Sequence, residues 1–275
     1  MDTLWVNGLR LAYDITGTGP VVVLVSGAHP AAVWHRRAVP LLVDAGYQVV
    51  TFDHRGIPPS DVPEPPYSID DLAADTIGVL EGLDLRRCHI VGACAGAVAA
   101  QRAALSRPEL LRSVSFLAGG GNIAAVGRQM LDALVELYSM PSPAPAIERT
   151  LFGNLLIPPT DWPEPEHGFA RVERLVTSYR SPVGLLGHVS AVRQWADEEH
   201  RDELARLTVP ALAVAAEWDP LFQSQDVRAA MDAVPDGRYA ELPGAPHMFL
   251  PQIDVVLEKF VIGFLREHDE PADVA

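Results

Sequence analysis

One stretch decides the fold of this chain: Cys88-His-Ile-Val-Gly-Ala-Cys-Ala-Gly-Ala-Val-Ala-Ala-Gln-Arg-Ala-Ala-Leu105. Its first part is a short apolar run typical of a buried strand, and its second part has the small residues of a tightly packed helix. Cys94 lies at the turn between them, with Gly92 and Gly96 two residues away on either side. Glycines at this spacing allow a sharp strand-to-helix turn that would lift the thiol above a sheet. The amide of Ala95 and the helix N-terminus would then face the sulfur and favour a thiolate.

Cys94 could be a nucleophile at this turn, or it could be a small buried cysteine of the core. The rest of the chain has to decide between these two interpretations. The second cysteine, Cys88, lies at the other end of the expected strand, about 20 Å from Cys94. A disulfide closes only when the two Cα atoms lie within roughly 7 Å of each other. Neither cysteine has partners at zinc-site spacing, so we expect no disulfide and no structural metal.

Length and composition favour one large core, because the chain has 275 residues of which 48% are hydrophobic. It contains no apolar run long enough for a transmembrane helix, and Met1–Trp5 lacks the pattern of a secretory signal. We therefore predict a cytoplasmic protein. The net charge of −15 repels phosphate backbones and anionic lipids, so neither nucleic acid nor a membrane is an expected partner.

Strand-like and helix-like segments alternate along the chain, a pattern typical of a mostly parallel sheet flanked by helices. At the N-terminus, Leu4–Val6 and Leu9–Ile15 are predicted to form a hairpin that turns at Asn7-Gly8. Further strands are expected at Val21–Val25, Tyr47–Phe52, Ser113–Leu117, Val209–Ala215 and Arg238–Leu242, and helices at Ala38–Ala45, Ile69–Leu83, Gln223–Ala233 and Ile253–Arg266.

The alternation of strand-like and helix-like segments stops in the middle of the chain. Residues 122–205 contain helical patterns broken by many prolines, and no strand is legible there. We interpret this region as a helical lid inserted into a core domain made of residues 1–121 and 206–275, because a separate core would be too small.

Three residues with complementary chemistry each follow a predicted parallel strand: Cys94, Asp219 and His247. The sheet would gather them at one edge despite their distance in sequence. Their order is nucleophile, acid, histidine, and this order resembles that of the α/β-hydrolase superfamily. Four segments carry the resemblance, which covers nearly the whole chain: Ser26-Gly-Ala-His-Pro30, Asp53-His-Arg-Gly-Ile-Pro-Pro-Ser60, Gly92–Gly96, and Glu217–Pro220 with Gly244–His247.

The chain also departs from the usual pattern of that superfamily. Most members carry serine at the position of Cys94. A cysteine there resembles the dienelactone hydrolase branch, and an aspartate there would have indicated epoxide hydrolase or dehalogenase chemistry. Ser26 replaces the usual histidine of the oxyanion loop, and Pro58 replaces a common glycine.

The resemblance implies a role for each site residue and no need of a cofactor. Asp219 would orient His247, His247 would take the proton of Cys94, and the amides of Ala28 and Ala95 would hold the oxyanion. The loops that would face the pocket also carry four candidates for substrate contact: His29, Trp34, His54 and Trp218. Arg55 is expected to anchor its own loop through carboxylates or carbonyls, and His167 and His188 are interpreted as surface or packing residues.

Three functions fit these residues. The first is hydrolysis of an ester, lactone or thioester of a small, hydrophobic substrate, which could be a natural product, through an acyl-Cys94 intermediate. The second is a lyase of natural-product biosynthesis, in which His247 abstracts a proton and an acyl or carboxylate group such as acetate leaves. The third is a ligand-binding protein without catalysis. In each case we expect a small-molecule ligand and a monomer or homodimer.

Overall fold

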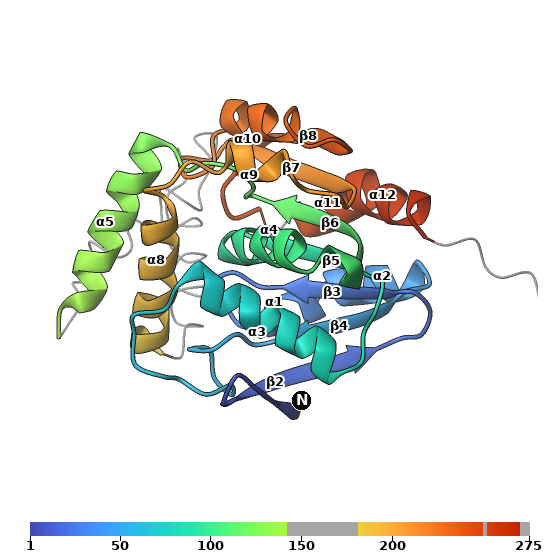
Figure 1. Ribbon diagram of the computed structural model, residues 1–275, viewed down its shortest axis with the longest axis horizontal. Coiled ribbons are helices and arrows are strands. Elements are labelled where there is room, and N and C mark those ends of the chain that lie inside the picture. Colours follow the sequence, from blue (N-terminus) through green and yellow to red (C-terminus); the bar gives the residue numbers. More distant parts are fainter. Residues whose placement is uncertain (142–180, 250–251, 270–275) are drawn as a thin grey trace, which may run out of the picture.

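Eight strands form a single sheet in the order β1-β2-β4-β3-β5-β6-β7-β8 (Figure 1). The structure is a computed structural model, and it describes residues 1–141, 181–249 and 252–269. β1 and β2 pair antiparallel, as do β2 and β4, and every later pairing is parallel. The strands are β1 (Asp2–Val6), β2 (Leu9–Thr16), β3 (Val21–Val25), β4 (Gln48–Phe52), β5 (Cys88–Ala93), β6 (Leu111–Leu117), β7 (Ala211–Trp218) and β8 (Gly237–Pro246).

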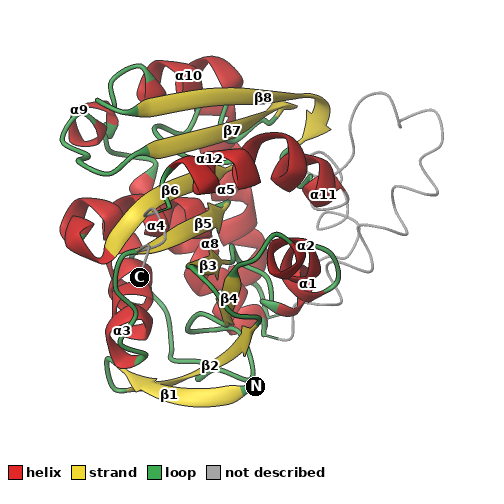
Figure 2. Cartoon of the chain, turned by 90° about the vertical axis from the view of Figure 1, so that its right-hand side faces the viewer, coloured by secondary structure: helices red, strands yellow, loops and turns green. Residues whose placement is uncertain are grey.

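Helices cover both faces of this sheet, as Figure 2 shows. Successive residues of a strand point to opposite faces. Val23 and Val25 of β3 belong to the core under α3, α4 and α10, whereas Val22 and Leu24 belong to the core under α1, α2, α11 and α12. The helices of these two layers are α1 (Ala32–His35), α2 (Ala38–Asp44), α3 (Ile69–Gly82), α4 (Ala95–Ser106), α10 (Ser224–Met231), α11 (Ile253–Val256) and α12 (Ile262–Glu267).

Local chemistry explains the first elements. Asn7 and Gly8 both have positive φ, at 50° and 79°, which is the backbone that a two-residue hairpin turn needs. The predicted hairpin is confirmed by the pairing of β1 with β2. At the start of α3, Ser68 and Asp71 form a reciprocal capping box, in which the Ser68 hydroxyl accepts from the Asp71 amide at 3.0 Å.

The predicted bounds of three C-terminal elements are wrong. β7 begins two residues later than predicted, after Pro210, and continues to Trp218. β8 continues past Leu242 to Pro246, because pairing with β7 holds a Gly-Ala-Pro segment that has little strand propensity of its own. The predicted long last helix is interrupted by one π-helical stretch, Leu257–Val261, between α11 and α12.

Three described helices connect β6 to β7: α5 (Ala125–Ser139), α8 (Pro182–Trp195) and α9 (Arg201–Leu204). α5 and α8 pack against each other and lie beyond the carboxyl ends of the parallel strands (Figure 1). Part of the region predicted as a lid, including His167, lies outside the described residues. Among the helices of the described ranges there is no candidate for a membrane span.

Candidate active site

The turn between β5 and α4 consists of one residue, Cys94, whose φ of 54° and ψ of −123° are strained for a residue with a side chain. The flanking glycines are required by packing. A Cβ atom at Gly92 would lie 2.4 Å from the carbonyl oxygen of Gly96, and one at Gly96 would lie 2.2 Å from the carbonyl oxygen of Val25. The strand and the helix therefore meet closely enough to expose the thiol at the carboxyl edge of the sheet.

Cys94, His247 and Asp219 come together at this edge. His247 Nε2 lies 3.1 Å from Cys94 Sγ, and His247 Nδ1 lies 2.7 Å from Asp219 Oδ2. The other carboxylate oxygen of Asp219 accepts hydrogen bonds from the amides of Leu221 at 2.8 Å and Phe222 at 3.0 Å. These two amides fix the carboxylate, which in turn fixes the imidazole ring.

Electrostatics at this site favour a charged imidazole. Burial by itself would lower the pKa of His247, but the Asp219 carboxylate and the Cys94 sulfur outweigh it, and together they raise this pKa well above its usual value. Such a histidine holds a proton taken from the thiol. Cys88 is unsuited to form a thiolate near neutral pH, because burial raises its pKa to about 12. Both cysteines are free, as predicted.

Two residues with backbone amides near the thiol, Ala95 and Ala28, line the same cavity as Cys94. Ala95 is the first residue of α4, so its N–H has no carbonyl partner within the helix. Among the described residues, the Ala28 amide makes no recorded hydrogen bond to a backbone carbonyl either. The loop that carries Ala28 packs tightly on the elbow, because a Cβ atom at Gly27 would lie 3.1 Å from the Cβ atom of Cys94. Among the described residues, neither amide is therefore bonded to a backbone carbonyl.

A cavity opens above Cys94, between the edge of the sheet and the helices α5 and α8. Its described walls are mostly apolar, and Cys94 and His247 form part of its lining. The other described lining residues are Ala28, His29, Ala95, Leu131, Leu134, Leu185, His188, Val189, Val192, Leu221 and Met248. An apolar cavity of this kind suits a small organic molecule.

Comparison with known proteins identifies the family. The model of the alpha/beta hydrolase family matches residues 22–258. The chain belongs to the α/β hydrolase family. It is 26% identical over 271 residues to the rhodomycin D methylesterase DnrP of Streptomyces peucetius, covering 89% of each chain. It is 28% identical over 261 residues to BpoC of Mycobacterium tuberculosis H37Rv, provisionally named a non-heme bromoperoxidase, covering 87% of this chain and 91% of BpoC.

Solved structures show the same architecture. The enol-lactonase of Burkholderia xenovorans LB400 superposes with a TM-score of 0.80 at 20% identity, covering 97% of this chain and 99% of that one. The structure of Rv0554 from Mycobacterium tuberculosis gives a TM-score of 0.85 at 25% identity, covering 95% of each chain. The α/β-hydrolase fold with a mostly parallel sheet, expected from the sequence motifs, is therefore confirmed.

Three of the four candidates for substrate contact, His29, Trp34 and Trp218, have different surroundings in this hydrolase. His29 lines the cavity above Cys94. Trp34 is fully buried, and its indole N–H donates to Ser26 Oγ at 2.7 Å; its ring borders a second, smaller hollow that also touches Cys94. Trp218 lies apart. It is 47% exposed, it is the last residue of β7, and it lines a separate surface hollow with the side chains around Pro220.

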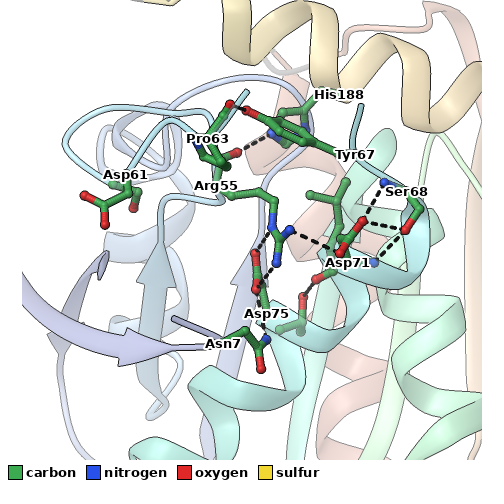
Figure 3. Close-up of polar contacts among 12 residues, drawn as sticks. Asn7, Arg55, Asp61, Pro63, Tyr67, Ser68, Asp71, Asp75 and His188 are labelled. Atoms are coloured by element: carbon green, nitrogen blue, oxygen red, sulfur yellow. Dashed lines mark hydrogen bonds and ion pairs between the residues drawn. The ribbon is translucent and has the colours of Figure 1, made fainter. Parts of the chain in front are cut away.

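The loop after β4 explains how Arg55 is used. Its guanidinium donates to both carboxylate oxygens of Asp75, at 2.6 and 2.8 Å, and forms an ion pair with Asp71 at 3.1 Å (Figure 3). The prediction that Arg55 anchors its own loop is confirmed. His54, on the same loop, is fully buried against Phe52 and does not line the cavity above Cys94.

The expectation that His188 is a surface or packing residue is confirmed only for packing. His188 lies on α8 and is 1% exposed, and it also lines the cavity, which sequence reasoning does not reveal. Its position four residues before the buried Val192, on an apolar helix face, was the available signal, and that signal does not distinguish packing from binding. No group of three His, Cys, Asp or Glu side chains in the described ranges is arranged to hold a metal ion.

Proposed function

We propose that this α/β hydrolase cleaves an ester, lactone or thioester of a small hydrophobic substrate, with Cys94 as its nucleophile. The contact of 3.1 Å between Cys94 Sγ and His247 Nε2 carries the proposal. It pairs a nucleophile with a base that Asp219 orients, and it does so at the floor of an apolar cavity.

The reaction follows from these positions. His247 takes the thiol proton, and the Cys94 thiolate forms a bond to the acyl carbon while the carbonyl electron pair moves onto oxygen. The amides of Ala28 and Ala95 donate to that oxyanion, and loss of one such donor commonly costs about 3 kcal/mol of transition-state stabilisation. When the carbonyl re-forms, the alcohol or thiol leaves with the proton from His247, and an acyl-Cys94 thioester remains.

Hydrolysis of the thioester repeats the sequence with water. His247 removes a proton from water as the oxygen attacks the acyl carbon, and the C–S bond then breaks to release the carboxylic acid. The methylesterase named above supports this class of reaction by its own name. No described contact and no relative named above favours the lyase alternative. We also propose that α5 and α8 act as the lid over the substrate.

The test uses the full chain with p-nitrophenyl esters and thioesters of short and medium acyl length in heavy-oxygen water. We expect an acyl mass added to the peptide that carries Cys94 and one heavy oxygen in the released acid. Cys94→Ala should abolish both, whereas Cys88→Ala is the matched control because this cysteine lies buried away from the cavity. An unlabelled or unsaturated product, or full turnover in Cys94→Ala, would refute the proposal.

A further inference from the structure

The cavity contains two polar side chains that the proposed reaction does not use, His29 and His188. Four of the described side chains that line the cavity can form hydrogen bonds. Two of them are His29 and His188, and the remaining two, Cys94 and His247, are paired with each other. His29 is 2% exposed and His188 is 1% exposed. Buried polar atoms in proteins nearly always have partners, so each exception needs an explanation.

His188 is held in a defined protonation state by its surroundings. Its Nε2 atom lies 2.8 Å from the carbonyl oxygen of Arg55, which can only accept, so Nε2 carries the hydrogen (Figure 3). Burial lowers the pKa of His188 to about 4, which keeps the ring neutral near neutral pH. Its Nδ1 atom is therefore a bare acceptor, and among the described residues it has no hydrogen-bond partner.

The packing of α8 keeps this ring in place. The helix approaches the loop after β4 so closely that a Cβ atom at Gly184 would lie 1.8 Å from the carbonyl oxygen of Gly56. The carbonyl that His188 contacts belongs to Arg55, whose side chain Asp75 holds from the other side (Figure 3). Rotation of the imidazole would break its hydrogen bond, so Nδ1 cannot easily exchange roles with Nε2.

His29, in the loop after β3, repeats the arrangement. Its Nδ1 atom lies 3.3 Å from the carbonyl oxygen of Pro30, so Nδ1 carries the hydrogen and Nε2 is the acceptor. Burial also lowers the pKa of His29 to about 4. Two neutral rings from different parts of the chain thus each have a free acceptor nitrogen in a cavity whose other described walls are apolar apart from the reacting pair.

We propose that His188 and His29 form a binding subsite in which one of their two acceptor nitrogens at a time accepts a hydrogen bond from a hydroxyl group of the substrate, away from the scissile carbonyl. The identity of the substrate as an ester or thioester rests on the proposed function. A neutral hydroxyl can donate its one hydrogen to either neutral acceptor, whereas a carboxylate would meet lone pairs and would lose its hydration without a donor in return. The structure thus narrows the substrate class to hydroxylated hydrophobic acyl compounds.

Two substitutions at His188 separate its two nitrogens. The amide nitrogen of a glutamine can reach the place of Nε2, so His188→Gln keeps the bond to the Arg55 carbonyl and removes the acceptor. The side-chain oxygen of an asparagine lies near the place of Nδ1, so His188→Asn keeps an acceptor and loses that bond. His29→Asn is the second variant: its amide can still donate to the Pro30 carbonyl, but the acceptor at Nε2 is lost.

The substrates are p-nitrophenyl 3-phenylpropanoates that carry a hydroxyl at the ortho, meta or para position, each compared with its methyl ether. At one position we expect the hydroxyl compound to have a kcat/KM about 10- to 100-fold higher, because the ether leaves the buried acceptor unpaired. His188→Gln should remove most of this ratio, and His188→Asn should retain more of it. Val189→Ala, on the same cavity wall, is the control that should change rates without changing the ratio.

Equal rates for hydroxyl and ether at every position, or a ratio unchanged in both His188→Gln and His29→Asn, would overturn the subsite. Calorimetric binding of methyl 3-(hydroxyphenyl)propanoates to Cys94→Ala separates the subsite from catalysis. A hydroxyl preference there that His188→Gln removes supports the subsite even when the wild-type chain hydrolyses nothing, which would refute only the proposed function. Hydrolysis without any hydroxyl preference would refute only the subsite.

Discussion

Replacement of Asp219 by asparagine changes the chemistry of the site with little change of shape. The Asp219 side chain is fully buried and contacts His247 Nδ1 at 2.7 Å and the amides of Leu221 and Phe222 at 2.8 and 3.0 Å. In Asp219→Asn, the amide oxygen continues to accept from the two backbone amides, so the NH₂ group turns toward His247. Since that group donates, the ring must accept at Nδ1 and carry its hydrogen at Nε2, opposite Cys94.

The expected loss follows from these contacts. The substitution leaves His247 unable to take the thiol proton, and it removes the carboxylate that raises the pKa of His247 against the effect of burial. In a serine protease the corresponding change lowers kcat by about 10⁴-fold. A thiol depends less on its base than a hydroxyl does, so we expect kcat/KM to fall by about 10²- to 10³-fold here, or about 3–4 kcal/mol.

Alkylation by iodoacetamide measures the same effect without a substrate. In a Cys88→Ala background the wild-type site should react rapidly at neutral pH, whereas Asp219→Asn should need alkaline pH. Asp44→Asn is the matched control, because Asp44 is an exposed carboxylate at the end of α2. If Asp219→Asn kept both the alkylation profile and the turnover of the wild type, the assignment of His247 as the base would be refuted.

Three further outcomes are expected in urea denaturation. Gly96→Ala should lower the free energy of unfolding by about 1–3 kcal/mol, because the added Cβ atom would press on neighbouring backbone. Gly263→Ala is the control, because a Cβ atom there would have no neighbour within 4 Å, and it should leave the free energy of unfolding unchanged. Equal effects of the two substitutions would contradict the packing argument. Ser68→Ala should cost about 1 kcal/mol through the lost cap of α3, and an unchanged midpoint would exclude that contribution. Burial lowers the pKa values of His29 and His188 to about 4, so between this pH and about 6.5 the folded state binds fewer protons than the unfolded state. The free energy of unfolding should therefore fall as the pH falls from about 6.5 toward 4, by up to about 2 kcal/mol per histidine at pH 5. His188→Gln should reduce this slope, and an identical slope would show that His188 is not responsible.

The parts of the fold that sequence predicts well depend on local chemistry. The turn at Asn7-Gly8 and the elbow around Cys94 each need backbone geometry that only a few residue types allow, so their residues reveal them. The end of β8 depends on pairing with β7, which no local pattern specifies. The role that we propose for His188 cannot be predicted locally for the same reason, because the orientation of its ring depends on a hydrogen bond to the carbonyl of Arg55, far away in the sequence. Trp34 shows the converse case, because an aromatic side chain near a site can equally be a packing residue.

The departure at Ser26 illustrates how distant contacts replace a residue expected from the family pattern. Ser26 Oγ accepts from the buried indole of Trp34 at 2.7 Å, and the Ala31 amide donates to Asp53 Oδ1 at 2.6 Å. These bonds fix both ends of the short loop that carries Ala28, one through the first turn after β3 and the other through the loop after β4. The direction of the Ala28 amide therefore does not require a histidine at position 26. Ser26 leaves the backbone of the loop anchored, and the histidine of this loop that lines the cavity is His29, which we propose as part of the hydroxyl subsite.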